Sequence, residues 1–502
     1  PTVAKEGETG KKKRKGNIGI PPDFMIKCLS LPHHSSGMAT DTYSTESKEY
    51  ENSLDTSYKK GKGIYYTDME LSSRIIKFLE IPCGAYILDP CCGTGNFIVS
   101  ARNSGHENVY GSDIDANAIA LCQRKSGIKN ITVLDTLANN GKDILRELHL
   151  KSPVDYVIGN PPYVPINKDI TIDTPDRLFL KSVKESGSNL FIAAIYRAFE
   201  LACPNGVISY IIPKNFLHVA SYSKLRKLIL SEKTILSIID IGVYFKSVRG
   251  EQIIITLKNS HIPNHNIRIY GYGNNEFIKR LEVPQSFYDN EILLFENETD
   301  FRIYKRLESS YKKLGDICTG YVGRGKSKSP SAVTGKDIRK FSLKNAPVPQ
   351  KGDRVFIQNI YSAEAGIIAS FAGNLEASET VTVITDRDEN MCRYILGILH
   401  SRLCNYFLLK FCYNNSKLTM HTDAKYLKKL PFIINSRTFN KIVSIVKLLE
   451  QTRYMSDEWF EAVESLNDVV YETYDIGRAE SGYIDAQMRG VQSGKWDYNR
   501  QK

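Results

Sequence analysis

The sequence predicts an α/β protein in which a parallel sheet of seven strands is followed by a region of mixed α+β structure. Between residues 61 and 260, short apolar runs alternate with amphipathic stretches, a pattern typical of a parallel sheet with helices on both faces. Beyond residue 290 the alternation fades, and short β-prone runs give way to two amphipathic helices at 439–451 and 458–474. The chain therefore contains more than one structural region.

Seven apolar runs are the expected strands. In chain order they are residues 85–89, 108–113, 131–135, 154–160, 206–213, 235–241 and 252–257. The expected helices between them are residues 72–80, 117–125 and 190–203. Four runs end at a polar side chain, and open α/β sheets bind ligands at the carboxyl ends of their strands. A ligand site is therefore expected at that edge.

The length of 502 residues predicts two or three domains. Residues 1–60 are polar and show no helical or strand period, so we expect a flexible N-terminal segment. Residues 61–285 contain the expected sheet, and residues 286–502 form the expected second domain. The basic cluster at 11–15 is interpreted as a solvated tail or as an accessory nucleic-acid contact.

The positive charge of the chain is concentrated in one segment. The formal net charge is +11, and residues 301–360 hold fourteen Lys and Arg against four Asp and Glu, a local net charge of +10. Such a segment favours a polyanionic partner. The ten cysteines include no CxxC pair, which argues for a reduced chain without structural zinc. With no membrane-length apolar run and no signal peptide, we expect a soluble, cytoplasmic protein.

The first chemical motif is Asp-Pro-Cys-Cys-Gly-Thr-Gly-Asn-Phe at 89–97, directly after the first expected strand. Gly93 and Gly95 allow a tight turn whose N–H groups can approach a ligand, although a glycine-rich turn without a ligand is the alternative. The motif is neither a dinucleotide fingerprint nor a P-loop. Further on, Asp113 can accept both hydroxyls of a ribose, with Asp115 as the competing candidate and as an expected helix cap.

The second motif is Asn160-Pro161-Pro162-Tyr163, which follows the fourth expected strand. Two prolines stiffen the backbone and remove two donors, which leaves the Asn160 amide oxygen and the Pro161 carbonyl as acceptors. An amino group whose two N–H bonds are both accepted has its lone pair free to attack an electrophile. Tyr163 offers a flat face to a base that has left its helix. A chance proline turn is the alternative.

Together, the two motifs resemble the S-adenosylmethionine-dependent amino-methyltransferases of DNA, specifically the γ-class adenine-N6 enzymes of bacterial restriction-modification systems. In that class the cofactor motif precedes the catalytic tetrapeptide and a target-recognition domain follows, which is the order in this chain. The resemblance extends upstream to residues 63–67, with Asp68 where the family often has Pro. Downstream it includes the helix that opens at Asn189, and Phe245.

The resemblance implies a Rossmann-like seven-stranded methyltransferase sheet with a C-terminal α+β target-recognition domain. The implied catalytic residues are Asn160, Pro161, Pro162, Tyr163 and Phe245. Phe245 would stack the flipped adenine opposite Tyr163, or is a core residue beside a strand. The implied cofactor residues are Thr67, Asp89, Cys91, Gly93, Gly95, Phe97, Asp113, Ile114, Asp135 and Asn160. Within that set, Asp135 would accept a hydrogen bond from the adenine amino group of the cofactor, unless it is a cap or turn residue.

The implied reaction is direct transfer of a methyl group from S-adenosylmethionine to the N6 amino group of a flipped-out adenine in duplex DNA. It needs no metal, and a cognate restriction endonuclease would be a separate partner. The basic segment suits phosphate contacts, or is a solvated face. The implied DNA-binding residues are Arg324, Lys326, Lys328, Arg339, Lys340 and Lys344.

Other functions share parts of this pattern. The tetrapeptide also occurs in enzymes that methylate RNA or the glutamine side chain of release factors, which predicts a chain ending soon after the last strand. About 240 residues follow that strand here. An inactive DNA-binding specificity subunit is a further alternative, against which the intact motifs argue. A restriction enzyme with a fused nuclease is another alternative. We do not expect one, because the sixty residues before the expected sheet are too few for a nuclease domain and no carboxylate–Lys cluster suggests one downstream.

Overall fold

A computed structural model shows how these motifs are arranged. It describes residues 37–55, 67–245, 250–344, 347–416 and 418–491. The chain divides into two compact units, residues 1–181 with 189–209, and residues 182–188 with 210–502. The boundary between the units falls inside an expected strand, and the division into domains at residue 285 stays a prediction. Among the described residues, no helix is long and apolar enough to cross a membrane.

One nine-stranded mixed sheet has the strand order β3-β2-β1-β4-β5-β7-β6-β8-β9. The first seven strands are β1 (Ile87–Asp89), β2 (Val109–Asp113), β3 (Ile131–Val133), β4 (Val154–Gly159), β5 (Ala202–Pro213), β6 (Thr234–Gly242) and β7 (Gln252–Lys258). All seven expected strands are present, and the predicted Rossmann-like α/β class is confirmed. The strands β8 (Asn266–Gly273) and β9 (Glu276–Pro284), which sequence reasoning missed, extend the sheet.

The pairing of the strands explains why they could be predicted from apolar runs in the sequence. β1 runs parallel to both β2 and β4, and β2 runs parallel to β3. A strand inside a parallel sheet is covered on both faces and is therefore apolar along its length. Leu88, Val157 and Ile158 accordingly have no exposed surface. Beyond them, β6 is antiparallel to β7 and parallel to β8.

The helices of the first unit are α2 (Gly37–Ser53), α4 (Met69–Phe78), α5 (Asn96–Asn103), α6 (Ala116–Ser126), α7 (Gly141–Glu147), α8 (Arg177–Glu185, which ends across the unit boundary) and α9 (Leu190–Leu201). Four of them, α4, α6, α7 and α9, begin at side-chain caps. Asp68 accepts from the Leu71 amide at 2.8 Å, so the residue that replaces the family's Pro caps α4. Asp115 caps α6 and Asn189 caps α9, as expected.

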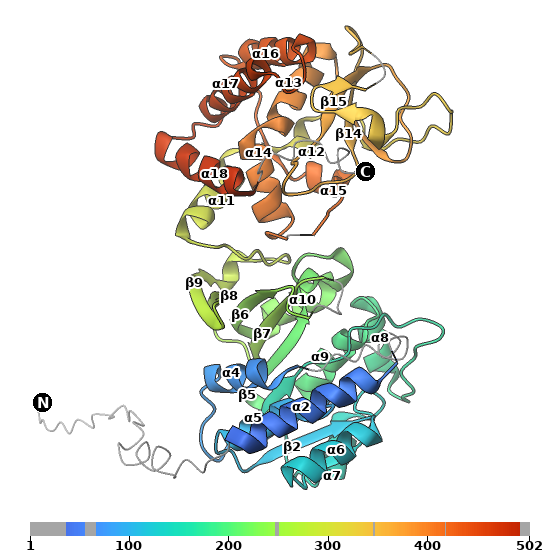
Figure 1. Cartoon of the computed structure of the whole chain (residues 1–502), viewed down its shortest axis with the longest axis vertical. Coiled ribbons are helices and arrows are strands. Elements are labelled where there is room, and N and C mark those ends of the chain that lie inside the picture. Colours follow the sequence, from blue (N-terminus) through green and yellow to red (C-terminus); the bar gives the residue numbers. More distant parts are fainter. Residues whose placement is uncertain (1–36, 56–66, 246–249, 345–346, 417, 492–502) are drawn as a thin grey trace, which may run out of the picture. The chain divides into compact units, whose positions relative to one another are not determined.

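Helix α2 corrects the expected flexibility for residues 37–53 alone, and for the rest of residues 1–60 it stays a prediction. Residues 37–53 are helical and pack against α6 (Figure 1). Sequence reasoning missed this helix because its sequence has no apolar stripe. Ser47 is 4% exposed, and its hydroxyl lies 2.6 Å from the Thr94 hydroxyl. The basic cluster at 11–15 and residues 63–66 lie outside the described residues.

The second unit continues with α10 (Ser223–Glu232), α11 (Glu298–Ser310) and a four-stranded antiparallel sheet in the order β11-β16-β14-β15. These strands are β11 (Val322–Arg324), β14 (Arg354–Gln358), β15 (Ala369–Gly373) and β16 (Val381–Thr385). The helices that follow are α13 (Glu389–His400), α14 (Arg402–Phe407), α16 (Phe439–Gln451), α17 (Asp457–Thr473) and α18 (Arg478–Val491). The two predicted helices are α16 and α17, and Ser456 caps α17 by accepting from the Trp459 amide.

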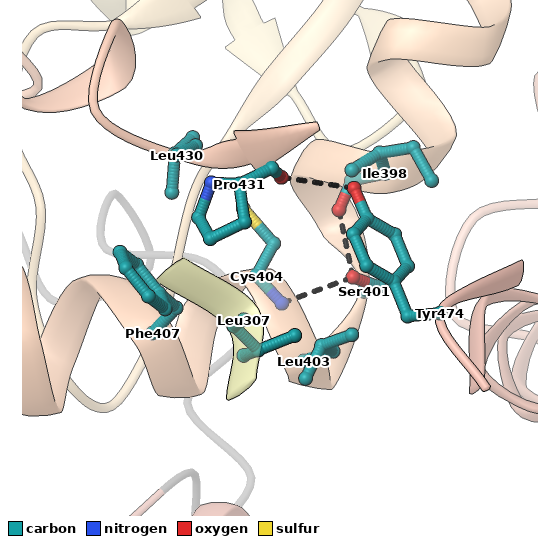
Figure 2. Close-up of a pocket in the computed structure, with 9 residues that line it drawn as sticks. All are labelled: Leu307, Ile398, Ser401, Leu403, Cys404, Phe407, Leu430, Pro431 and Tyr474. Atoms are coloured by element: carbon teal, nitrogen blue, oxygen red, sulfur yellow. Dashed lines mark hydrogen bonds between the residues drawn. The ribbon is translucent and has the colours of Figure 1, made fainter. Parts of the chain in front are cut away.

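A small apolar pocket lies in the helical part of this unit (Figure 2). Its polar groups bond to one another: the Tyr474 hydroxyl donates to the Pro431 carbonyl at 2.9 Å, and the Ser401 hydroxyl donates to the Ile398 carbonyl at 2.7 Å. The Cys404 amide in turn donates to the Ser401 oxygen at 3.1 Å. These bonds leave little polar capacity for a ligand, so we interpret the pocket as a packing gap in the core.

Candidate cofactor and base site

The strand order brings the two sequence motifs to one place. β1 lies between β2 and β4. The connection after β1 leads to β2, and the connection after β4 leads away from it to β5, so the strand order reverses here, and ligands of open α/β sheets bind at such a switch point. Asp89 ends β1, and Asn160 directly follows β4. Gly159 makes this closeness possible. It has φ +152°, and a Cβ at this position would lie 2.5 Å from Asp89 Oδ1.

The loop after β1 turns back on itself through two glycines. Gly93 and Gly95 have φ of 51° and 88°, a left-handed conformation that side chains with a Cβ disfavour. The Gly93 amide donates to Asp113 Oδ2 at 2.7 Å, and the Cys91 amide donates to Asp89 Oδ1 at 3.1 Å. The loop is therefore held by the two carboxylates that end β1 and β2.

A pocket opens between this loop and the end of β4. Its lining residues are Thr67, Asp89, Cys91, Cys92, Thr94, Asn96, Phe97 and Asn160. Five of these were predicted as cofactor residues, and they come from three separate segments of the chain: Thr67, Asp89, Cys91, Phe97 and Asn160. Sequence reasoning gave no role to Cys92, Thr94 and Asn96, although all three lie within the first motif.

A buried carboxylate lies in the wall of the pocket. Asp89 is 2% exposed, and burial raises its pKa well above the usual value. Burial, followed by the charges of nearby carboxylates, also raises the pKa of the Cys91 and Cys92 thiols. Both thiols are therefore protonated at neutral pH, and a protonated thiol is a poor nucleophile. A positively charged ligand group would oppose the raised pKa and stabilise the Asp89 carboxylate, so the pocket suits a ligand that carries such a charge.

The predicted ribose and adenine residues do not line this pocket. Asp113 already accepts two backbone amides, those of Gly93 and Asp115, and Ile114 is 53% exposed. Asp135 Oδ1 accepts from the Leu137 and Ala138 amides at 3.0 and 3.1 Å, which is the turn role considered as its alternative. The cofactor roles of Asp113, Ile114 and Asp135 stay predictions.

The Asn-Pro-Pro-Tyr loop is closed by a contact within the motif. The Tyr163 hydroxyl donates to Asn160 Oδ1, and burial raises the pKa of Tyr163 well above its usual value. Its ring meets Phe191 of α9 edge-on, with the ring centroids 6.3 Å apart. After the motif, the Leu190 amide donates to the Val164 carbonyl at 2.9 Å. The start of α9 therefore anchors the tetrapeptide loop.

Phe245 belongs to the second unit and follows β6. The Gln252 side chain accepts from the Tyr244 and Phe245 amides at 3.1 and 3.4 Å and donates to the Gly250 carbonyl at 2.7 Å. Phe245 is 9% exposed and meets the Tyr244 ring edge-on at 5.2 Å. Its stacking role stays a prediction beside the alternative of a core residue.

An ion pair lies at the carboxyl ends of β5 and β6. Lys214 Nζ lies 3.0 Å from Asp240 Oδ2 and 3.6 Å from Glu251 Oε2, and all three side chains are less than a tenth exposed. Burial would raise the pKa of Asp240, but the charges of Lys214 and Arg280 hold it below the usual value. Removal of Lys214 would therefore leave buried carboxylates without their main partner.

The basic residues predicted to contact DNA fall into two groups. Arg324, Lys326 and Lys328 are exposed at the end of β11 and in the loop that follows. Arg324 pairs with Asp423 at 3.1 Å, and Lys326 lies over the Tyr321 ring at 5.7 Å. The remaining three, Arg339, Lys340 and Lys344, are partly or fully buried.

Lys340 corrects the predicted set of DNA contacts. It is 3% exposed, and burial lowers its pKa to about 7. It lies in the turn of the hairpin formed by β12 (Ile338–Arg339) and β13 (Ser342–Leu343), next to Phe341, whose ring packs on His400 at 4.0 Å. This packing draws the turn into the core, so Lys340 is not available to a phosphate in this structure.

Comparison with known proteins relates the region around this pocket to restriction-modification methyltransferases. Residues 107–245 match the family model of the Eco57I restriction-modification methylase. The type II methyltransferase M.VspI of Vibrio sp. (strain 343) is 27% identical over 249 residues, covering 48% of this chain and 59% of that protein. The modification methylase CviBIII of Paramecium bursaria Chlorella virus NC1A is 25% identical over 200 residues, covering 39% and 49%.

The chain thus spans about half the length of the curated relatives that it matches. Among solved structures, the type IIL restriction-modification enzyme MmeI in complex with DNA aligns with a TM-score of 0.48 at 13% identity, covering 93% of this chain and 78% of that one. The ATP-dependent type ISP restriction-modification enzyme LlaBIII bound to DNA aligns with a TM-score of 0.49 at 14% identity, covering 82% and 41%.

Proposed function

We propose that this chain is a DNA methyltransferase of a restriction-modification system that transfers a methyl group from S-adenosylmethionine to the N6 amino group of a flipped adenine. One observation carries the proposal: the cofactor motif after β1 and the Asn-Pro-Pro-Tyr motif after β4 line one pocket at the switch point of the sheet. The match of residues 107–245 to restriction-modification methylases supports it.

The pocket fits the methionine end of the proposed cofactor. Asp89 offers a buried carboxylate to a cationic group. Thr67 Oγ1 is buried and has no hydrogen-bond partner among the residues that the structure describes, so it can bond a ligand. Cys91 and Phe97 complete the wall. Asp113 is proposed for the ribose and Asp135 for the adenine of the cofactor. When bound, the cofactor supplies an electrophilic methyl group.

The chain's own residues would align and polarise the target amine. The Asn160 amide oxygen and the Pro161 carbonyl accept the two N–H bonds of the adenine amino group, which frees the nitrogen lone pair for attack. Tyr163 stacks on the base, and by the resemblance Phe245 is the second stacking aromatic. Because the thiols of Cys91 and Cys92 stay protonated, no covalent enzyme intermediate is proposed.

The proposed partner is duplex DNA, with a cognate restriction endonuclease acting as a separate protein. Exposed Arg324, Lys326 and Lys328 are proposed to contact phosphates, which hold the duplex without reading its sequence. Arg339 and Lys344 are weaker candidates because both are partly buried, and the Arg339 guanidinium lies over the Tyr454 ring at 5.7 Å.

Asn160→Ala tests the proposal. The variant should lose methyl transfer to plasmid DNA in a methylation-sensitive digestion, while it still binds S-adenosylhomocysteine in calorimetry. Asn440→Ala, at an exposed position of α16, is the matched control and should transfer normally. Transfer by the Asn160 variant would contradict the assigned role. Labelled methyl groups that appear on RNA or release factor but not on DNA would refute the DNA assignment.

A further inference from the structure

We infer that Asn96 binds the α-ammonium group of the cofactor's methionine moiety, and that Ser47 of helix α2 positions Asn96 for this contact. The inference rests on the proposed use of S-adenosylmethionine and adds two residues to its site. Asn96 lines the pocket and is the first residue of α5. Ser47 lies before residue 61, where the catalytic domain was predicted to begin.

The hydrogen bonds of Asn96 determine which way its amide points. Asn96 Nδ2 lies 2.5 Å from the Thr67 carbonyl oxygen and 3.3 Å from Ser47 Oγ. A backbone carbonyl can only accept, so the NH2 group must face Thr67. The other end, Oδ1, is buried and has no hydrogen-bond partner within the described part of the chain. Asn96 is 7% exposed, so this oxygen is a buried acceptor that still needs a donor.

The other polar groups of the pocket indicate what that donor is. Asp89 is 2% exposed and lines the same pocket. A ligand group that bonds to both a carboxylate and an amide oxygen needs at least two hydrogen-bond donors, N–H or O–H, and a positive charge strengthens both bonds. An ammonium group has three donors and no acceptor. The methionine moiety carries one, and its carboxylate is left to a donor such as the Thr67 hydroxyl.

Helix α2 holds this arrangement from outside the sheet. The Ser47 hydroxyl, 4% exposed, contacts both Asn96 Nδ2 and, at 2.6 Å, Thr94 Oγ1, and Thr94 also lines the pocket. One turn further along, the Tyr50 hydroxyl donates to Asp115 Oδ2 at 2.8 Å. α2 is therefore bonded to the loops that follow β1 and β2. Ser47 does not line the pocket, so it is a positioning residue.

The test compares two ligands in each protein. S-adenosylhomocysteine keeps the ammonium group, and its deamino analogue lacks it. Calorimetry on the full chain should show that wild type prefers S-adenosylhomocysteine. Asn96→Ala should bind S-adenosylhomocysteine about tenfold more weakly, as expected for loss of a charge-assisted hydrogen bond, and should bind the analogue as wild type does. Ser47→Ala should lower the same preference by a smaller factor. Ser53→Ala, exposed on the last turn of α2, should not change it.

The ratio of the two affinities is measured within one protein, so a general loss of folding does not change it. An equal loss for both ligands in Asn96→Ala and Ser47→Ala would show a merely structural role and overturn the inference. Unchanged affinity for S-adenosylhomocysteine in Asn96→Ala would also overturn it, and would leave the proposed function in place. Wild-type protein that binds neither ligand would overturn the proposed cofactor and this inference together.

Discussion

The Tyr163 hydroxyl occupies the acceptor that the proposed reaction needs. It donates to Asn160 Oδ1, and because burial raises its pKa it keeps its proton at neutral pH. The bond takes one of the two lone pairs of the Asn160 oxygen, so it competes with an adenine amino group for that acceptor. Tyr163→Phe removes the hydroxyl and keeps the ring, which packs edge-on against Phe191. The substitution therefore separates stacking from competition for the Asn160 oxygen.

The size of the effect follows from the strength of one hydrogen bond. A bond of this kind contributes about 0.5–1.5 kcal/mol net, because water can replace the lost partner. Asn160 is only half-buried, so water can reach its oxygen in the variant. A value of about 1 kcal/mol corresponds to roughly a fivefold change in an equilibrium constant. Tyr163→Phe should therefore increase the flipped fraction of the target base, and kcat/KM for DNA, by about fivefold.

The measurement needs the target sequence, which methylome sequencing of cells expressing the protein would supply. A duplex with 2-aminopurine at the target position then reports flipping as a rise in fluorescence. Tyr86→Phe is the control, because that ring is 43% exposed and stacks on Tyr110. A fall in flipping and in kcat/KM for Tyr163→Phe would refute the reasoning and show that the hydroxyl assists the reaction. No change would show that this bond does not limit base entry.

Three further predictions concern charged residues. The double variant Lys326→Ala with Lys328→Ala should bind duplex DNA more weakly in an anisotropy titration, and the dependence of its affinity on salt should fall by about 1.8 in slope. Lys340→Met, at a buried position, should change neither the affinity nor the slope. An effect of Lys340→Met without an effect of the double variant would place the phosphate contacts elsewhere. Lys340→Met should raise the free energy of unfolding at pH 6, as measured by urea titration. This gain should shrink as the pH rises from about 7 to 10.5, because in that window the lysine binds more protons in the unfolded state than in the native state, so the wild type becomes more stable. A gain that does not vary with pH would contradict the low native pKa. Lys214→Met should cost about 3–5 kcal/mol in the free energy of unfolding, because it leaves Asp240 buried without its main partner, and adding Asp240→Asn should recover part of the loss. A cost below about 1 kcal/mol would argue against a buried pair.

The elements that carry the motifs were predictable because their signals are local. Strands covered on both faces are continuous apolar runs, which is how β1, β4 and β5 were found. The strands that were missed have a weaker pattern. β8 alternates between buried and exposed residues over its first half, and β9 has only two buried residues, so neither strand stands out as an apolar run. Arg268 and Glu276 are among the exposed residues. α2 has no apolar stripe and is held by polar contacts such as that of Ser47.

The sequence by itself determined the local features on which the proposed chemistry depends, because the turn at Gly93 and Gly95 and the acceptors of Asn160 and Pro161 depend on neighbouring residues in the chain. Only the tertiary structure decided which distant side chains share the pocket and which charges reach the surface. The orientation of the Asn96 amide depends on Thr67, 29 positions away, and the burial of Lys340 depends on packing against α13. Local sequence determines the backbone conformation and the spacing of buried residues along a helix or strand. The partners of a polar side chain depend instead on how the helices and strands pack.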